Sequence, residues 1–519
     1  MLEKYLNNRF CVLYLFPFII GSFATLSFAP FNLTIVNFIV LPLFFYLLVY
    51  INKKSKSIYR NKSYKKNFFI FGLAFGFGFF LSGISWIVSS LTFDENFKIL
   101  IPFAVVLIPL FLSLFFAFIS LIIGPYLRFN FPSLILVIVS LAFIDFLRAK
   151  VFTGFPWNLW AYSATGSEEV LQLVNLIGLY SFNLLVLTLF ILPSIIFFKL
   201  SLVKKILIYF FSISFILAIY IYGSYEINKN KKFLDSINEK INFKIISPNF
   251  DLEYGLNIND IEDRLKKLIR YSDPEKNIKT IFVWPEGVFS GYSYNDLLIF
   301  KKLIRRKFDK NHFIIFGVNK LDSISGDFYN SMLLVNNNFD IVQSYNKRKL
   351  VPFGEFLPFE NILNNFGFKK ITEGHGSYLK GKINNNLKID KLSILPLICY
   401  EIIFTDLIQK SNENTNLIVN ISEDGWFGKS IGPDQHFVKS IFRAIENNTF
   451  LIRSANRGVS AIIDNKGNII KKINRNEAGN IEFEVPLVKS NKIKNDLIFF
   501  VLLIKYLLIF LIYRKLNAK

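Results

Sequence analysis

The sequence contains few cysteines, few histidines and a deficit of acidic residues. Of 519 residues, two are cysteine and three are histidine, and 38 Asp and Glu face 60 Lys and Arg. Two cysteines are too few for a disulfide scaffold or a cysteine-based zinc site. About 390 residues separate Cys11 from Cys399, so we expect Cys399 to be a free thiol. Because no metal-ligand spacing is present, we expect neither a metal nor an organic cofactor.

Hydrophobic residues, by contrast, are abundant. They make up 52% of the chain, the mean hydropathy is +0.40, and 61 residues are Phe. A soluble protein of this composition would expose large apolar patches. The formal charge of +22 fits basic cytoplasmic loops and anionic lipid better than nucleic acid, since no nucleic-acid motif accompanies the scattered basic residues. We therefore predict an integral membrane protein that binds no nucleic acid.

The apolar stretches and their basic loops predict a topology. Stretches long enough to cross a bilayer occur at 11–28, 32–51, 68–91, 99–124, 131–147, 171–198, 206–223 and 497–513. The loop 52–66 carries seven Lys or Arg and no acidic residue, which indicates a cytoplasmic loop. Counting the crossings from this loop places both termini in the cytoplasm and everything between the last two stretches outside. The predicted domains are a membrane domain with seven transmembrane helices (1–224), an extracytoplasmic domain (225–495) and an eighth helix with a cytoplasmic tail (496–519).

The extracytoplasmic domain alternates between strand and helix patterns. Short apolar runs bounded by turn residues predict strands at 243–247, 279–284, 312–317, 331–335, 341–345, 393–398, 416–421 and 459–464. Apolar residues at the 3.6-residue period predict helices at 259–271, 294–308 and 434–447. We place the cap of the first of these helices at Asn259 and Asp260. This alternation predicts an α/β domain with a mixed sheet.

Three segments of this domain end an apolar strand on a reactive polar residue. They are VWPEG with Glu286, YNKRKLVPFGEFLP with Lys347, and LPLICYE with Cys399. Each alone has an ordinary explanation: a turn glutamate, a solvated basic face, or a structural core cysteine. The apolar residues that follow Lys347 argue against a plain surface loop. Because side chains at neighbouring strand ends can converge, the three segments together indicate a catalytic site.

The three residue types suit acyl transfer through a thiol. A thiol needs a base to become a thiolate near neutral pH, and Glu286 can serve as one. An adjacent Lys347 would favour the thiolate and stabilise the oxyanion of a tetrahedral intermediate. The backbone N–H of Tyr400, directly after Cys399, can donate a second hydrogen bond to that oxyanion.

The motifs resemble those of a known family. WPEG, YNKRKLVPFGE and ICYE, in this order, resemble the Glu-Lys-Cys triad of the nitrilase superfamily. The remaining motifs resemble its membrane-bound branch, the apolipoprotein N-acyltransferases: FAPF from Phe28, TGFPWN from Thr153, PFGEFLP from Pro352, NISEDGWFG from Asn420, GPDQH from Gly432 and RSANRGVS from Arg453. The resemblance covers nearly the whole chain. It implies a multi-span α-helical membrane domain plus an α/β nitrilase-like domain, an αββα sandwich, outside the cytoplasm.

The resemblance also implies residue roles. Glu286 resembles the general base, Lys347 the oxyanion-stabilising lysine and Cys399 the nucleophile. Further site residues that it implies are a glutamate supporting the lysine, the pair following the nucleophile and an active-site asparagine: Glu355, Tyr400, Glu401 and Asn330. The chain departs from the family at 247–254, where it has Ser-Pro-Asn and then Asp-Leu-Glu-Tyr instead of a Gln-x-Asn pattern and a Lys-Trp pair. We assign no substrate contact there.

The reaction implied by the resemblance is the last step of bacterial lipoprotein maturation. A membrane phospholipid gives an acyl chain to Cys399 as a thioester, and the α-amino group of the N-terminal diacylglyceryl-cysteine of an apolipoprotein then takes it. The expected location is the bacterial inner membrane, with the catalytic domain in the periplasm. We expect the chain to act as a monomer.

Three other readings stay open at the level of sequence. A membrane-anchored amidase would use the same triad on a soluble amide, although one anchor would suffice for it. A transporter or receptor with an outer sensor domain would place intramembrane charges along a path, for which Asp145, Arg148 and Lys505 are candidates. A papain-like Cys–His site would need one of the three histidines, His312, His375 or His436.

Overall fold

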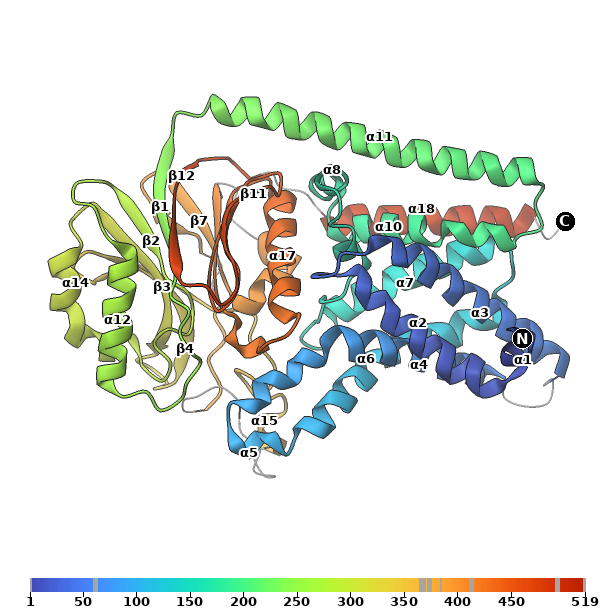
Figure 1. The fold of residues 1–519 in the computed structure, drawn as a ribbon, viewed down its shortest axis with the longest axis horizontal. Helices are drawn as coiled ribbons and strands as arrows, with labels where there is room; N and C mark the ends of the chain where they lie inside the picture. Colours follow the sequence, from blue (N-terminus) through green and yellow to red (C-terminus); the bar gives the residue numbers. More distant parts are fainter. Residues whose placement is uncertain are drawn as a thin grey trace. The chain divides into compact units, whose positions relative to one another are not determined.

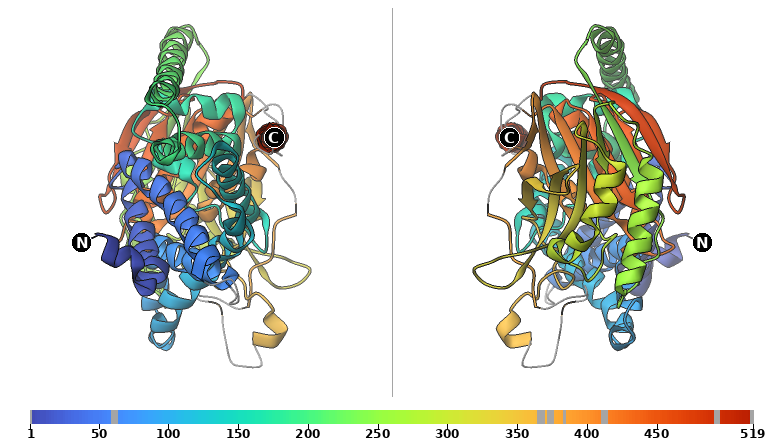
Figure 2. Two further views of the ribbon diagram at one scale, coloured as in Figure 1. Left: turned by 90° about the vertical axis from the view of Figure 1, so that its right-hand side faces the viewer. Right: turned by 90° about the vertical axis from the view of Figure 1, so that its left-hand side faces the viewer.

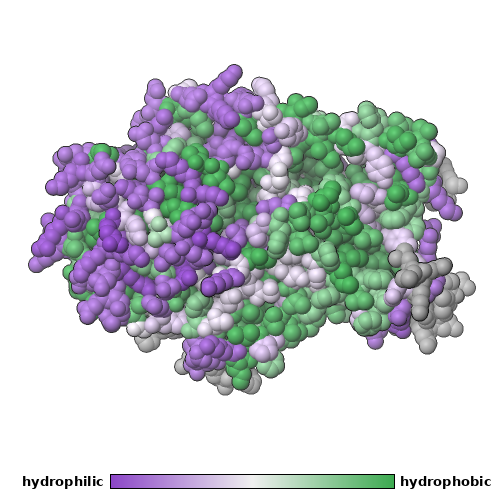
Figure 3. All heavy atoms as spheres, viewed as in Figure 1, coloured by the Kyte–Doolittle hydropathy of each residue, from purple (hydrophilic) through white to green (hydrophobic). Residues whose placement is uncertain are grey.

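The chain forms two compact units of different character. The computed structural model describes residues 2–58, 64–363, 370, 376–382, 385–409, 415–490 and 495–516. The helical unit contains Met1–Val88, Ile99–Glu226 and Ile493–Lys519, and the α/β unit contains Ser89–Lys98 and Ile227–Lys492. In the face shown in Figure 3, hydrophobic residues dominate the surface of the helical unit and hydrophilic residues that of the α/β unit.

Within the described residues, seven helices are long and apolar enough to cross a membrane. These apolar spans are Thr34–Lys54, Lys65–Thr92, Ile101–Tyr126, Phe131–Lys150, Leu179–Phe197, Leu202–Asp235 and Asp496–Lys515. They overlap seven of the eight predicted stretches, and the first predicted stretch coincides with a shorter apolar helix, Cys11–Ser27. The helices that contain these apolar stretches are labelled in Figure 1: α2 (Phe16–Ala24), α3 (Asn37–Ile58), α4 (Lys65–Ile84), α6 (Ile101–Ile123), α7 (Phe131–Lys150), α10 (Leu179–Ile191), α11 (Leu202–Asp235) and α18 (Asn495–Leu516).

Glycines let three of these helices approach closely. Gly72 and Gly76 of α4 lie against α6, and Gly78 lies against α2. A β-carbon on Gly72 would lie 2.4 Å from the carbonyl oxygen of Phe116, and one on Gly78 would lie 2.1 Å from that of Phe18. Lipid provides no hydrophobic drive between helices, so such close backbone packing is what holds transmembrane helices together. The α2–α4–α6 packing therefore depends on these small residues.

Two predicted intramembrane charges form a structural ion pair. Asp145 and Arg148, both on α7, are buried and lie 3.0 Å apart. Asn183 donates a further hydrogen bond of 3.0 Å to Asp145, and Arg148 donates to the main-chain oxygen of Phe155. The pair thus anchors the loop after α7, whereas Lys505 is exposed on α18. Two of the three charges that a transporter would place along a path are therefore paired with each other.

The α/β unit contains two six-stranded mixed sheets. Their orders are β12-β1-β2-β3-β4-β5 and β11-β10-β9-β8-β7-β6. β1, β2 and β3 are parallel to one another in the first sheet, as are β7, β8 and β9 in the second. The strands are β1 (Lys240–Ser247), β2 (Thr280–Val283), β3 (His312–Leu321), β4 (Phe328–Asn336), β5 (Ile341–Asn346), β6 (Leu387–Ile389), β7 (Leu392–Ile398), β8 (Leu417–Glu423), β9 (Leu451–Asn456), β10 (Ser460–Ile463), β11 (Ile469–Ile473) and β12 (Gly479–Pro486).

The two sheets pack face to face, and helices cover their outer faces. A buried cluster between the sheets includes Ile281 and Met332 of the first sheet and Ile398 and Val419 of the second. A second cluster joins the outer face of the first sheet to its helices, α12 (Ile258–Ser272) and α14 (Lys301–Lys307). The second sheet is covered by α17 (Gly432–Asn447), and Figures 1 and 2 show these layers in order. The predicted αββα sandwich is confirmed.

Candidate active site

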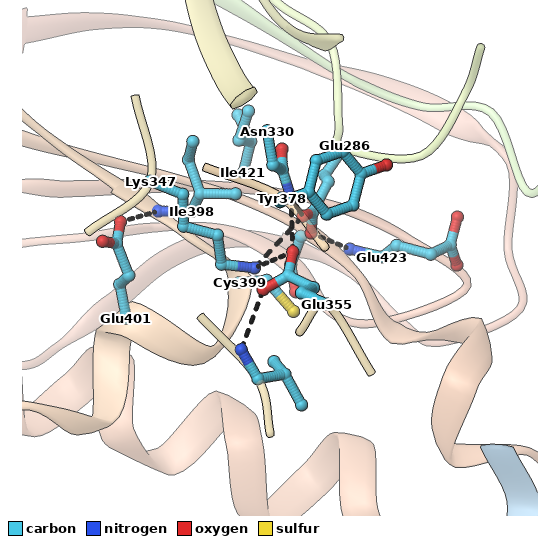
Figure 4. Close-up of polar contacts among 12 residues, drawn as sticks. Glu286, Asn330, Lys347, Glu355, Tyr378, Ile398, Cys399, Glu401, Ile421 and Glu423 are labelled. Carbon is cyan, nitrogen blue, oxygen red and sulfur yellow. Dashed lines mark hydrogen bonds and ion pairs between the residues drawn. The ribbon is translucent and has the colours of Figure 1, made fainter. Parts of the chain in front are cut away.

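The predicted triad lies where three strands end. Glu286 follows β2, Lys347 directly follows β5, and Cys399 directly follows β7. The first two strands belong to one sheet and β7 belongs to the other, so the site joins the two layers of the sandwich. Figure 4 shows the three side chains pointing toward one another. The structure therefore brings together what the sequence separates by 113 residues, from 286 to 399.

Lys347 is almost completely buried between two carboxylates. Its side chain is 1% exposed, and its Nζ lies 2.9 Å from Oε1 of Glu355 and 3.5 Å from Oε1 of Glu286. Burial opposes the charged ammonium, but the negative charges of Glu286 and Glu355 outweigh it and raise the pKa of Lys347 above its usual value. The ammonium therefore stays charged beside the thiol.

Asn330 on β4 holds the two carboxylates in place. Its Nδ2 donates to Oε1 of Glu286 at 2.8 Å and to Oε1 of Glu355 at 2.7 Å. Its main-chain oxygen accepts a hydrogen bond of 2.9 Å from the N–H of Lys347. The other oxygen of Glu355 accepts from the N–H of Val351 at 2.9 Å. Glu286, Asn330, Lys347 and Glu355 thus form one connected hydrogen-bond network.

Cys399 has an unusual backbone conformation and a protonated resting state. Its φ is +48°, in the left-handed region that residues other than glycine rarely adopt, and the chain turns there from β7 into a 3₁₀ helix, Cys399–Ile403. Burial raises the pKa of the thiol, the charge of Glu286 raises it further, and Lys347 lowers it. The thiol therefore needs a base to accept its proton before it can attack.

Glu401 ties the lysine segment to the cysteine segment. Its buried carboxylate accepts from the N–H groups of Arg348 at 2.7 Å and Ile398 at 2.9 Å, and from the hydroxyl of Tyr345 at 2.9 Å. One side chain thus links the end of β5 to the end of β7. Tyr400 is almost buried and packs edge-on against Phe404, 5.0 Å between ring centres.

A cavity of about 80 Å³ lies beside Glu286. The carboxyl-bearing residues Glu286, Glu355 and Glu423 line it together with Asn330 and Tyr378. Another wall residue, Trp426, contacts the rings of Phe93 at 5.5 Å and Tyr254 at 6.2 Å between centroids. Phe93 lies in 92–98, between the predicted membrane stretches 68–91 and 99–124, and Ser89–Lys98 belongs to the α/β unit. The cavity is small, partly acidic and open to the reactive carboxylate.

Comparison with known proteins identifies the family. Residues 20–192 match the apolipoprotein N-acyltransferase N-terminal domain, and residues 254–495 match the carbon-nitrogen hydrolase domain. The apolipoprotein N-acyltransferase of Rickettsia typhi is 32% identical over 479 residues, which cover 90% of this chain and 91% of that protein. That of Rickettsia prowazekii is 33% identical, with 80% and 83% covered. The chain belongs to the apolipoprotein N-acyltransferase family.

A solved nitrilase-superfamily structure resembles part of the chain. Nit3 of Saccharomyces cerevisiae, a member of branch 10 of that superfamily, is 15% identical to this chain, and the match covers 48% of this chain and 91% of Nit3, with a TM-score of 0.37.

The carbon-nitrogen hydrolase match, 254–495, contains every predicted site residue of this chain: Glu286, Asn330, Lys347, Glu355, Cys399, Tyr400 and Glu401.

Glu423 is a site residue that the sequence analysis missed. It is the last residue of β8, next to β7, and its N–H donates to Oε2 of Glu286 at 3.1 Å. Its own carboxyl accepts from the N–H of Gly425 and from Nδ2 of Asn456, both at 2.7 Å. Burial, opposed by these hydrogen bonds, raises the pKa of Glu423 to about 8. The criterion that identified the triad, a polar residue at the end of an apolar strand, also applies to Glu423.

The raised pKa of Glu423 predicts a pH-dependent contribution to stability. Its carboxyl is protonated in the folded protein up to about pH 8 but ionises near 4.5 in the unfolded chain. Unfolding between these values releases a proton, so the stability that Glu423 contributes is complete below pH 4.5 and is lost as the pH rises to about 8, by about 1.4 kcal/mol per pH unit. A Glu423→Gln variant does not titrate here. Its Tm, relative to that of the unchanged protein, should rise between pH 5 and 8, and a constant difference across this range would contradict the prediction.

The two histidines in the described part of the chain are buried, and each contacts a main-chain oxygen. His312 is buried and contacts the N–H of Asp309 and the carbonyl of Glu275. Nε2 of His436 lies 3.3 Å from the main-chain oxygen of Cys399. His375 lies outside the described residues. Among the side chains that the structure describes, no group of three or more His, Cys, Asp or Glu is arranged to hold a metal ion.

Proposed function

We propose that the chain transfers an acyl chain from a membrane phospholipid, through a thioester on Cys399, to the α-amino group of the N-terminal diacylglyceryl-cysteine of apolipoproteins. The observation that carries this proposal is the convergence of Cys399, Glu286 and Lys347 at the strand ends of an apolipoprotein N-acyltransferase family member. Acylation by phospholipid and transfer to an amine follow in sequence, with the lysophospholipid leaving first.

In the first half-reaction, Glu286 accepts the proton of the Cys399 thiol and the sulfur attacks the ester carbonyl of the phospholipid. The tetrahedral oxyanion is stabilised by the Lys347 ammonium and by the N–H of Tyr400. Collapse breaks the carbon–oxygen bond, and the departing alcohol of the lysophospholipid takes the proton from Glu286. The raised pKa of Cys399 explains why the base is needed, and that of Lys347 supplies a permanent counter-charge.

In the second half-reaction, the neutral α-amine attacks the thioester carbonyl. Glu286, ionised again, accepts a proton from the attacking nitrogen, and the carbon–sulfur bond breaks as the amide forms. Cys399 leaves as a thiolate and regains the proton. The cavity beside Glu286 supports this assignment, because its position gives the amine access to the base. Asn330 and Glu355 hold Glu286 and Lys347 in position through hydrogen bonds, and Glu401 links the ends of β5 and β7.

The proposed location is the bacterial inner membrane, with the termini in the cytoplasm, the catalytic domain (225–495) in the periplasm and the chain acting as a monomer. Ser89–Lys98 supports this orientation. The basic loop 52–66 predicts that the following span, 68–91, leads outward, so the loop 92–98 within this segment is expected outside. This segment belongs to the same compact unit as Ile227–Lys492. This grouping supports the proposal that the predicted outer loop and the catalytic unit lie on the same side of the membrane.

The test of the proposal is the mass of Cys399 in protein purified from membranes and incubated with phospholipid alone. We expect an acyl adduct on the peptide that contains Cys399, released by hydroxylamine and transferred when a diacylglyceryl peptide with a free α-amine is added. Cys399→Ala should carry no adduct, whereas Cys11→Ala, which alters the other cysteine of the chain, should carry it normally. Absence of a thioester with phospholipid, together with hydrolysis of a soluble amide, would instead support an amidase.

A further inference from the structure

The backbone of the nucleophile needs support from outside its own segment. At φ +48°, Cys399 adopts a conformation that is strained for a residue with a β-carbon, and such conformations persist where the surroundings fix them. The hydrogen bonds of Glu401 hold Ile398, the residue before Cys399. The peptide unit after Cys399, which contains its carbonyl oxygen and the N–H of Tyr400, is held by a different element.

That element is α17, through His436. The ring nitrogen Nε2 of His436 lies 3.3 Å from the main-chain oxygen of Cys399. A carbonyl oxygen only accepts hydrogen bonds, so Nε2 carries the proton in this contact. Burial and the charge of Arg453 lower the pKa of His436, whereas Asp424 raises it. The other ring nitrogen, Nδ1, lies 3.1 Å from a guanidinium nitrogen of Arg453.

A buried polar cluster fixes the orientation of the ring. Arg453 on β9 donates to Oδ2 of Asp424 at 2.7 Å, and Ser422 donates to Oδ1 of the same carboxylate at 2.7 Å. Asp424 Oδ1 lies 3.0 Å from Nδ1 of His436, and the ring of Phe427 packs 5.4 Å from that of His436. His436, Asp424 and Arg453 are each 1% exposed or less. The same cluster reaches the nucleophile, because Ser422 also hydrogen-bonds to the Cys399 side chain.

We propose that His436 is a positioning residue for the nucleophile: its Nε2–H holds the carbonyl of Cys399 and thereby fixes both the thiol and the N–H of Tyr400. The peptide unit is planar and trans, so its oxygen and its N–H point in opposite directions. Fixing the oxygen toward α17 therefore turns the N–H of Tyr400 to the opposite side. The effect of this positioning on acyl transfer rests on the proposed function, whereas the placement of the thiol does not depend on it.

Three variants of His436 and one control separate this role from a general structural one. His436→Leu removes the donor, His436→Gln keeps an N–H at a similar reach, and His436→Asn keeps an N–H that is one methylene short. Ser440→Ala is the matched control, because Ser440 lies one turn later on α17 and its buried hydroxyl has no hydrogen-bond partner among the described residues. Each variant is measured for alkylation of Cys399 by iodoacetamide, for single-turnover thioester formation with phospholipid, and for Tm.

We expect His436→Leu and His436→Asn to slow both alkylation and thioester formation by roughly 10- to 100-fold, as displacement of a reacting group does, with an unchanged KM for phospholipid. His436→Gln should stay within about threefold of the unchanged protein, and Ser440→Ala should match it. If His436→Leu does not fold, the comparison of Gln with Asn decides. Equal rates in Gln and Asn, or a normal rate in Leu, would overturn the inference. Failure of the proposed function alone would abolish thioester formation in every protein and leave the alkylation differences.

Discussion

Glu286→Gln should reduce thioester formation by roughly 10³-fold or more while leaving the fold intact. General bases contribute about 10²- to 10⁴-fold, and the structure offers the half-buried thiol a base at Glu286. Glutamine keeps the oxygen that accepts from Asn330, so the network at 2.8 Å survives in part. The measurement is the single-turnover rate of acyl-adduct formation on Cys399.

The control for this variant is a glutamate that lies away from the site. Glu484 on β12 is exposed, so Glu484→Gln should form the thioester at the normal rate. The loss in Glu286→Gln should also be a loss of rate at saturating phospholipid, because a base acts on the reaction and not on lipid binding. A rate within tenfold of the unchanged protein would show that another group removes the proton from Cys399.

Lys347→Met should abolish thioester formation and also destabilise the α/β unit by about 3–5 kcal/mol, since it leaves buried carboxylates without their cation. Glu355, 2.9 Å from the ammonium, and Glu286, 3.5 Å from it, both lose that partner. For a domain of this size, the change corresponds to a Tm lower by roughly 10 °C. The measurements are the thioester rate and the Tm at neutral pH.

A second substitution separates stability from chemistry. Lys347→Met combined with Glu355→Gln removes one of the two unpaired carboxylates, so we expect it to recover part of the Tm but none of the activity. Lys349→Met is the matched control. Lys349 pairs with Asp406 across 3.4 Å and is 30% exposed, so its loss should change stability by less than about 1 kcal/mol. Full stability in the single Lys347→Met variant would mean that the carboxylates are protonated when the lysine is absent.

The sequence predicted the strands that carry the triad because each is a buried apolar run with a polar end. β9 escaped prediction because Arg453 interrupts its apolar pattern, although its guanidinium is fully buried against Asp424. That partner lies on another element, so no local pattern shows it. β6, with three residues, is too short for a periodic signal.

The N-cap of α12 and the role of Glu423 were also not predictable from a local sequence pattern. The N-cap of α12 is Asn257, paired with Asp260 in a capping box, so the prediction of a cap at Asn259 was wrong by two residues. In the sequence, Glu423 is one of several polar residues that follow the predicted strand 416–421. Its position beside Glu286 follows from the pairing of β8 with β7 and from the packing of the two sheets, and both are properties of the tertiary structure.

Glu286 and Lys347 come from one sheet and Cys399 from the other, which gives the interior of the sandwich a role beyond holding the fold. The relative position of the base and the sulfur therefore depends on how the two sheets pack against each other. Buried side chains between the sheets, such as Met332 and Val419, take part in that packing. A substitution that changes the volume of such a side chain would shift the reacting groups relative to one another while leaving each of them chemically unchanged.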